Sequence, residues 1–222
     1  MLAGEDQARI EAANWIRLNV FGHNVAARRL YASLGYEPVG TMMTRRIDRT
    51  APPAPEDGPE DGPEGGMGVR LVPMSTEQYV AYRARAEKGY AANIASSGML
   101  PPAEAAEKAA EDFASLLPRG RDSPGHEFFT GYAGDLRVGL LWLHFTDRSD
   151  GLHVFGYDFE VPEELRRRGY GSSVLAAAEQ LCRRRGVTSV GLSVFGFNAA
   201  ARSLYERSGF EVTSEQLKKH LH

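Results

Sequence analysis

Short apolar runs alternate with helical patterns from residue 69 onward, and this order predicts a mixed α/β sheet. The second and third runs meet at Gly134-Asp135, a dipeptide typical of a hairpin turn, so the sheet should begin antiparallel. The predicted strands are residues 69–74, 126–133, 136–145, 153–161 and 187–195. The predicted helices are residues 75–96, a segment from Pro101-Pro102 to just before Pro118, and residues 172–185.

Two of these helices are amphipathic. Residues 75–96 place Tyr79, Tyr82, Ala86 and Tyr90 on one face, which we interpret first as a core-facing stripe. The next helix turns Ala105, Ala109, Phe113 and Leu116 inward. Its outward face carries Glu104, Glu107 and Glu111, which we interpret as a solvated surface, with attraction of a cationic amine as the alternative.

An internal repeat relates the two ends of the chain. At a constant spacing of 174 residues, as from Leu18 to Leu192, an identical residue recurs at twelve positions within about twenty. Both copies read as strand, Phe-Gly-x-Asn turn, helix and strand, with the Asn as helix N-cap. The recurring residues of the earlier copy are Leu18, Val20, Phe21, Gly22, Asn24, Ala26, Ala27, Arg28, Leu30, Tyr31, Gly35 and Glu37. We call residues 14–48 the first copy and residues 188–222 the second copy.

We expect the first copy to be half a domain, because Met1 lies opposite Leu175 and the part of the second copy's domain before Leu175 has no counterpart in residues 1–48. Residues 51–66 contain only Pro, Gly, Ala and acids, a composition that predicts a linker. The predicted organisation is a partial segment at 1–48, a linker at 49–66 and a complete domain at 67–222. We consider two hypotheses for the half domain: that Met1 is an internal methionine of a longer tandem protein, or that residues 14–48 dock onto the C-terminal domain of the same chain or of a partner chain in a homodimer.

Composition narrows the class of protein. A formal charge of −3 and a pI near 6.1 argue against nucleic acid and acidic membranes as partners. A single cysteine, Cys182, excludes a disulfide framework, and the six histidines show no metal-ligand spacing, so no metal is expected. Without a long apolar run or a secretory pattern at the start, the chain reads as cytoplasmic.

The segment 166–173, RRRGYGSS, lies between a predicted strand and a predicted helix and carries the candidate chemistry. Glycines allow close approach of a ligand to the main chain, N–H groups at a helix start point toward an anion, and arginines add positive charge. We therefore predict a phosphate-binding loop made of Arg166, Arg167, Arg168, Gly169, Tyr170, Gly171 and Ser172.

Residues 67–222 resemble the GNAT superfamily of acetyl-CoA-dependent N-acetyltransferases. Arg166, Gly169 and Gly171 meet its Arg/Gln-x-x-Gly-x-Gly/Ala loop pattern, and residues 192–212 resemble its later strand-Asn-helix unit. The resemblance implies a mostly antiparallel α/β sheet flanked by helices and splayed between its fourth and fifth strands. It implies acetyl-CoA in that gap, with its pantetheine arm bonded to the main chain around Phe159 and Val161.

The strand 153–161 offers two candidate bases. Strict alternation places Phe155, Tyr157, Phe159 and Val161 on one face and the acids Asp158 and Glu160 on the other, where mutual repulsion should raise one pKa. A base suits the reaction because the attacking amine must be neutral. We prefer Glu160, directly or through a water, and Asp158 is the alternative.

On the later helix, Asn198 and Tyr205 are two turns apart and share a face. The resemblance implies that Asn198 contacts the pantetheine arm and that Tyr205 protonates the leaving thiolate, while the tyrosine stripe of residues 75–96 walls the acceptor pocket. The sequence thus predicts an acyltransferase that moves an acetyl group from acetyl-CoA to a primary amine in a ternary complex. The alternative is a non-catalytic acyl-CoA-binding or interaction module.

Overall fold

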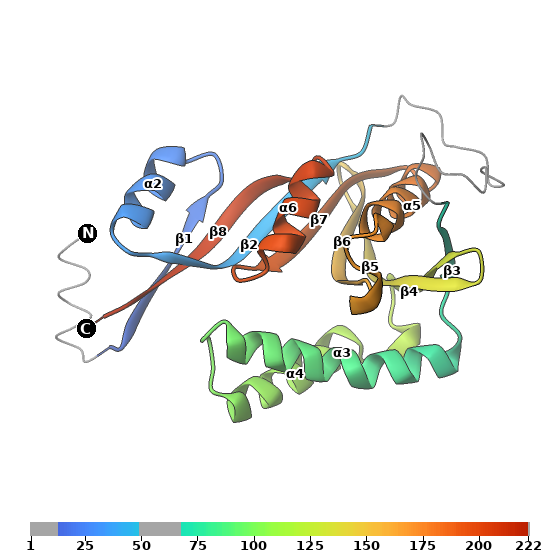
Figure 1. The fold of residues 1–222 in the computed structure, drawn as a ribbon, viewed down its shortest axis with the longest axis horizontal. Helices are drawn as coiled ribbons and strands as arrows, with labels where there is room; N and C mark the ends of the chain where they lie inside the picture. The colour runs from blue at the N-terminus through green and yellow to red at the C-terminus, as the bar shows by residue number, and fades with distance from the viewer. Residues whose placement is uncertain (1–12, 49–67, 222) are drawn as a thin grey trace. The chain divides into compact units, whose positions relative to one another are not determined.

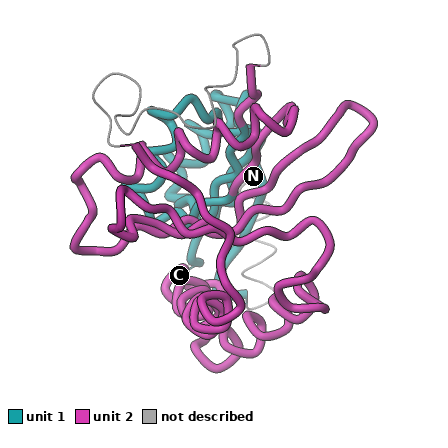
Figure 2. Tube along the Cα trace, turned by 90° about the vertical axis from the view of Figure 1, so that its right-hand side faces the viewer, with its two compact units in different colours: residues 1–44, 193–222 teal, residues 45–192 magenta. Residues whose placement is uncertain are grey.

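The computed structural model describes residues 13–48 and 68–221 (Figure 1). These residues form two compact units, coloured separately in Figure 2. Unit 2 comprises residues 45–192, and unit 1 joins the residues up to Thr44 with those from Ser193 onward. The predicted linker, residues 49–66, lies outside the described residues, and the predicted domain boundaries stay a prediction.

Unit 2 contains a sheet in the order β7-β6-β5-β4-β3. The pairs β3-β4, β4-β5 and β5-β6 are antiparallel, while β6 and β7 run parallel. The predicted strands are confirmed with small changes in their ends. They are β3 (Arg70–Pro73), β4 (His126–Ala133), β5 (Leu136–Arg148), β6 (Gly151–Glu160) and β7 (Val187–Phe195), the last continuing into unit 1.

Helices α3 (Thr76–Ser96) and α4 (Pro102–Leu116) cover one face of this sheet. Helix α3 begins with a capping box, in which the side chains of Ser75 and Gln78 each accept a bond from the other residue's main-chain N–H. The tyrosine stripe packs into the core as expected. Its cluster contains Tyr79, Tyr82, Phe113, Phe128, Leu140 and Trp142, with Ala86, Tyr90 and Leu116 at its margin. No described helix has the length and apolar character needed to cross a membrane.

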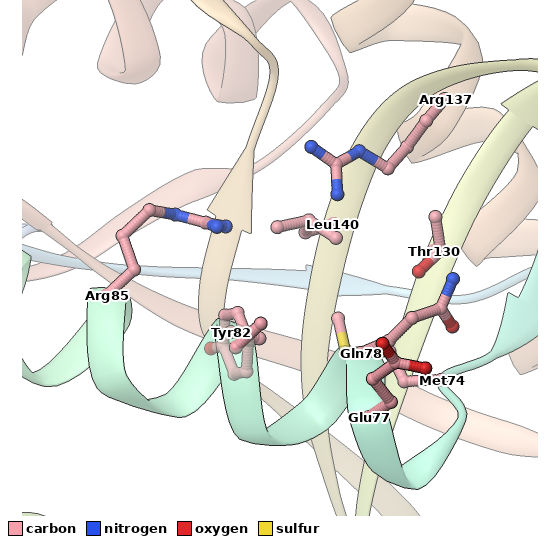
Figure 3. A pocket seen from close by; sticks show the side chains of 9 residues that line it. Met74, Glu77, Gln78, Tyr82, Arg85, Thr130, Arg137 and Leu140 are labelled. Atoms are coloured by element: carbon pink, nitrogen blue, oxygen red, sulfur yellow. The ribbon is translucent and has the colours of Figure 1, made fainter.

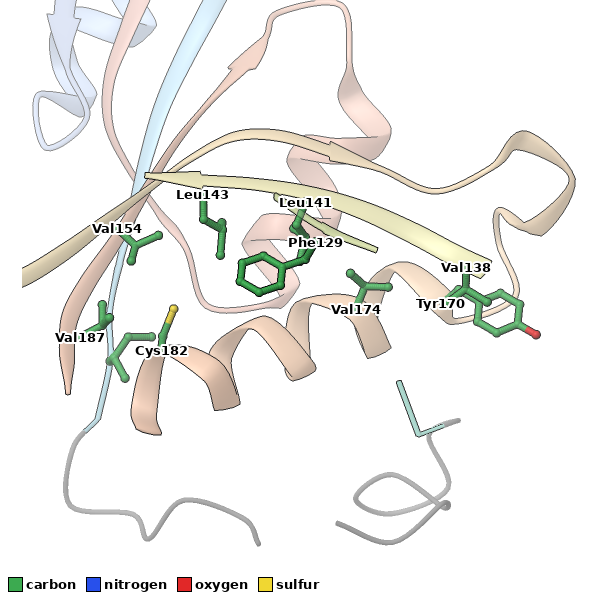
Figure 4. Packing of buried hydrophobic residues seen from close by; sticks show 10 residues of the cluster. Phe129, Val138, Leu141, Leu143, Val154, Tyr170, Val174, Cys182 and Val187 are labelled. Atoms are coloured by element: carbon green, nitrogen blue, oxygen red, sulfur yellow. The ribbon is translucent and has the colours of Figure 1, made fainter. Parts of the chain in front are cut away.

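Helix α5 (Tyr170–Arg184) packs on the other cluster of unit 2. Figure 4 shows its inward residues, Tyr170 at its start, then Val174, and Cys182 near its other end, against Leu141, Leu143 and Val154 of β5 and β6. The helix begins two residues earlier than predicted, at Tyr170. The sheet with helices packed on both faces is the mixed, mostly antiparallel α/β fold that the sequence predicts.

Unit 1 contains both copies of the repeat. The first copy forms β1 (Trp15–Phe21), α2 (Val25–Ser33) and β2 (Glu37–Arg46), and the second forms the end of β7, α6 (Ala199–Arg207) and β8 (Glu211–His220). Strand β8 lies between β1 and β2 and pairs antiparallel with both. Ala27 and Tyr31 of α2 and the following Leu34 are half-buried against Val20, Tyr36 and Leu217, and this packing forms a small core around the first copy.

Candidate active site

The loop between β6 and α5 has the main-chain geometry of an anion site. Gly169 is the N-cap of α5 with a left-handed φ of 89°, and Arg167 also has a positive φ, 59°. No side chain caps this helix start. The Ser173 N–H is the first to bond back along the helix, to the Gly169 carbonyl at 3.1 Å, so the N–H groups of residues 170–172 precede the helical bonding pattern. Such N–H groups, with the helix dipole, favour an anion.

The three loop arginines are exposed, so their positive charges face solvent around the loop. Arg166 is also tied to the end of β6, because its Nε donates to the Val161 carbonyl at 3.0 Å. The side chain of Tyr170 is buried in the α5 cluster, which leaves its main-chain N–H as the group it can offer to a ligand. A Cβ on Gly169 would meet no protein atom within 4 Å, so the left-handed backbone conformation, and not protein packing, favours glycine at this position.

The ladder between β6 and β7 is short. It runs from Leu152 opposite Val187 to Gly156 opposite Leu192, whereas β6 itself continues to Glu160. This end of β6 carries the residues around which the sequence analysis places the pantetheine arm and the base.

A β-bulge changes the predicted faces of β6. Trp142 pairs with Asp158 and the next residue, Leu143, pairs with Gly156, so Tyr157 is an extra residue. Tyr157 stacks on Trp142 at 4.7 Å, on the face toward α3, while Phe159 packs in the α5 cluster on the opposite face. The prediction that Tyr157 and Phe159 share a face was therefore wrong, because a bulge breaks the two-residue period of a strand.

Asp158 and Glu160 both face α3 but have different partners. The Tyr82 hydroxyl donates to the Asp158 carboxylate at 2.9 Å. Burial raises the pKa of Asp158, and the nearby Glu160 charge raises it further, while the Tyr82 bond acts in the opposite direction. Burial, followed by the Asp158 charge, also raises the pKa of Tyr82. Asp158 is thus committed to a bond with a tyrosine that stays protonated.

Glu160 forms an ion pair with Arg85 of α3, 3.0 Å between Oε2 and Nη2. Its side chain is 37% exposed, so solvent and a substrate can reach this carboxylate. Sequence reasoning missed Arg85, although it follows Tyr82 by three residues and therefore lies on the same side of α3. That spacing was the available signal.

A cavity of about 340 Å³ lies between α3 and strands β4 and β5, and Tyr82 and Arg85 are among the residues that line it. Figure 3 shows the Arg85 and Arg137 side chains reaching toward Leu140, one from α3 and the other from β5. Arg137 was not predicted as a site residue. The residues that line the cavity are Met74, Glu77, Gln78, Ala81, Tyr82, Arg85, Thr130, Arg137 and Leu140.

Asn198 and Tyr205 belong to unit 1, whereas the loop and Glu160 belong to unit 2. Asn198 caps α6, since its side-chain oxygen accepts a bond from the Ala201 N–H at 3.1 Å. Tyr205 is 8% exposed and packs edge-on against Phe210. The roles that the resemblance implies for these two residues stay predictions.

Cys182 is buried, and burial raises the pKa of its thiol to about 12, so the thiol stays protonated and is a poor nucleophile. Among the described residues, no group of three or more His, Cys, Asp or Glu side chains is arranged to hold a metal ion.

Comparison with known proteins identifies the family of this chain. Residues 95–210 match the Acetyltransferase (GNAT) family. The Bacillus subtilis protein named Uncharacterized N-acetyltransferase YycN is 35% identical over 156 residues, which cover 70% of this chain and all of that protein. Uncharacterized N-acetyltransferase YdgE of the same organism is 30% identical, covering 70% of this chain and 99% of that protein.

Solved structures share the fold. The crystal structure of YycN has a TM-score of 0.62 and covers 64% of this chain and 92% of that one. A GCN5-related N-acetyltransferase from Sphaerobacter thermophilus, 21% identical, covers all of this chain and 66% of that one at a TM-score of 0.55. The family match and these relatives show that this chain is an acyltransferase and belongs to the GNAT family of acetyltransferases.

Proposed function

We propose that this protein transfers the acetyl group of acetyl-CoA to a primary amine by direct attack in a ternary complex. The observation that carries the proposal is the start of α5, where Gly169 and Arg167 have positive φ and no side chain makes a capping hydrogen bond. This geometry suits the diphosphate of coenzyme A, which needs several N–H donors and positive charge at once. The donors would come from residues 167–172, with Arg166, Arg167 and Arg168 supplying the charge.

The end of β6 is the proposed site of the thioester. The main chain around Phe159 and Val161 would bond the pantetheine arm, and Asn198 would contact it from α6. A main-chain N–H placed at the thioester oxygen stabilises the charge that develops there during attack.

Glu160 is the proposed base. Its exposed, Arg85-paired carboxylate would take a proton from the incoming ammonium, directly or through a water, so that the neutral nitrogen attacks the acetyl carbon. The C–N bond forms and the C–S bond breaks. The thiolate would take a proton from the Tyr205 hydroxyl, the second proton given up by the new amide nitrogen would restore that hydroxyl through solvent, and Glu160 would return its proton to solvent. Asp158 is the weaker candidate because its carboxylate already accepts the Tyr82 hydroxyl bond.

The cavity beside Glu160 is the proposed acceptor pocket. Two guanidinium groups, those of Arg85 and Arg137, line it, and Arg137 has no ion pair with any described residue. Because guanidinium groups bind carboxylates well, an acceptor that carries a carboxylate near its amine is favoured over a purely cationic polyamine. Turnover of amino acids should therefore exceed that of the same compounds with the carboxylate converted to an amide.

Two measurements test the proposal. Calorimetry with coenzyme A should show binding that Gly169→Val abolishes and Gly134→Val leaves intact, since both glycines have positive φ and open surroundings but only Gly169 lies in the loop. The second measurement is thiol release from acetyl-CoA in the presence of a panel of amines, which we expect to observe. Glu160→Gln should lower kcat of this reaction at least tenfold. Glu127→Gln is the matched control, because Glu127 has the same 37% exposure and also pairs with an arginine.

The outcomes separate the alternatives. Binding of acetyl-CoA without turnover of any amine would favour the non-catalytic acyl-CoA-binding module. An unchanged affinity for coenzyme A in Gly169→Val would contradict the assignment of the loop.

A further inference from the structure

The two copies of the repeat pair with each other in unit 1 around a local two-fold axis. Exchanging the two copies about such an axis leaves the structure unchanged. A contact between residue i of the first copy and residue j of the second must therefore recur between residues i + 174 and j − 174. The ladder between β2 and β8 obeys this rule throughout. Glu37 lies opposite Lys218 and Glu211 opposite Thr44, and the further pairs are Pro38 with Leu217, Val212 with Met43, Gly40 with Gln216, and Ser214 with Met42.

Contacts outside the ladder follow the same rule. The Gly22 N–H donates to the Thr213 carbonyl at 2.8 Å, and the equivalent Gly196 N–H donates to the Val39 carbonyl at 3.0 Å. Internal geometry is also duplicated. The aromatic pairs Tyr31–Tyr36 and Tyr205–Phe210 have centroid distances of 5.5 and 5.6 Å, and the pairs Phe21–His23 and Phe195–Phe197 have 5.6 and 5.5 Å.

The axis passes between Thr41 and Glu215, the one pair in the ladder that the exchange maps onto itself. Glu215 is 6% exposed and accepts bonds from Arg28 and Arg202, which are equivalent residues of the two copies. One buried carboxylate therefore binds two guanidinium groups related by the axis.

The Phe-Gly-x-Asn glycine of each copy is required by the other copy. A Cβ on Gly22 would lie 1.8 Å from the Val212 carbonyl oxygen, and a Cβ on Gly196 would lie 1.7 Å from the Pro38 carbonyl oxygen. Both glycines have main-chain atoms of the opposite copy where a side chain would begin. The recurrence of Gly in both copies thus reflects their mutual packing.

We propose that residues 15–46 are a built-in partner for the second copy and occupy a surface that a second molecule of this chain takes when the first copy is displaced. A two-fold contact is isologous, so the surface that the second copy offers to the first is suited to another second copy as well. In that homodimer two Glu215 carboxylates and two Arg202 guanidinium groups would meet at the axis, which balances the charge there. The exposed strand β8 would again be paired on both sides.

Three single substitutions in the full chain test the proposal by size-exclusion chromatography with light scattering. Gly22→Val should displace the first copy but leave the second intact, so the monomer should become a dimer. Gly196→Val damages the surface needed for either partner and should give no dimer. Gly40→Val is the control, because a Cβ there would contact only the Gln216 side chain at 3.7 Å, and it should stay monomeric.

Cleavage gives an independent measurement. A specific protease site inserted between residues 48 and 68 allows the folded full chain to be cut, after which the two fragments should remain together in native mass spectrometry. Release of the N-terminal fragment in mild urea should convert the C-terminal fragment to a dimer. The proposal is overturned if Gly22→Val is monomeric with a native circular dichroism spectrum, or if the released C-terminal fragment stays monomeric or unfolds.

Discussion

Replacement of Glu215 by Gln should destabilise the protein strongly, although Glu215 lies outside the predicted phosphate loop. The carboxylate is 7% exposed and accepts bonds from Arg28 Nε at 2.7 Å, Arg28 Nη2 at 2.9 Å and Arg202 Nη1 at 3.0 Å. An amide in its place leaves the Arg28 guanidinium without its carboxylate partner and leaves Arg202 with the more exposed Glu206 alone. Removal of one partner from a buried ion pair costs 3–5 kcal/mol.

Both arginine side chains are 27–28% exposed, and solvent therefore offsets part of this loss. We take the lower end, about 3 kcal/mol, which corresponds to a fall in Tm of about 6–12 °C for a chain of this size. Urea unfolding at pH 7, followed by circular dichroism, measures the difference. Glu206→Gln is the matched control, because Glu206 also pairs with Arg202 but is 49% exposed, and it should cost about 0.5 kcal/mol or less.

The pH dependence of this difference tests its electrostatic origin. Burial raises the pKa of Glu215, but the bonds and charge of Arg28 and then of Arg202 outweigh it, and the net result is a lowered pKa. A carboxyl whose pKa is lower in the folded state contributes stability above its unfolded pKa, about 4.3, and loses it as the pH falls. The gap between wild type and Glu215→Gln should be constant above about pH 5 and shrink below pH 4. Equal stabilities at pH 7, or a gap that widens in acid, would refute the reasoning.

Three further predictions concern other parts of the molecule. Tyr205→Phe should lower kcat at least tenfold with little change in acetyl-CoA affinity, whereas Tyr31→Phe, its equivalent in the first copy, should leave kcat unchanged; equal losses would argue against a proton donor at Tyr205. Thr41→Val should stabilise the protein by about 1 kcal/mol, because the Thr41 hydroxyl is buried without a hydrogen-bond partner among the described residues. Thr188→Val should destabilise instead, since the Thr188 hydroxyl donates to the Leu152 carbonyl at 3.0 Å, and urea unfolding of both variants checks the contrast. Burial and then the His144 charge lower the pKa of His126 to about 4, so the folded state favours neutral His126 and loses stability as the pH falls from about 6.5 toward 4. His126→Gln should reduce that loss by about 1 kcal/mol, a small figure because the ring is only partly buried, and identical Tm–pH profiles would contradict it.

The local structure of this protein follows from its sequence. The Asn24 and Asn198 caps, the hairpin at Gly134-Asp135 and the glycine-led start of α5 depend on residues within a few positions of each other, so their physics is complete in a short window. The candidate loop could be identified for the same reason, because its arginines, glycines and helix start are contiguous. The repeat was also visible, since a constant spacing is a property of the sequence alone.

Tertiary structure decided the features that need distant partners. The bulge at Tyr157 arises from register between β5 and β6, and no residue of β6 alone distinguishes it from regular alternation. The different settings of Asp158 and Glu160 depend on Tyr82 and Arg85, which come from a helix more than seventy residues away. The same holds for Glu215, whose two arginines come from opposite ends of the chain. Sequence spacing records which residues recur, but burial and charge pairing depend on which surfaces meet, and only the folded chain brings those surfaces together.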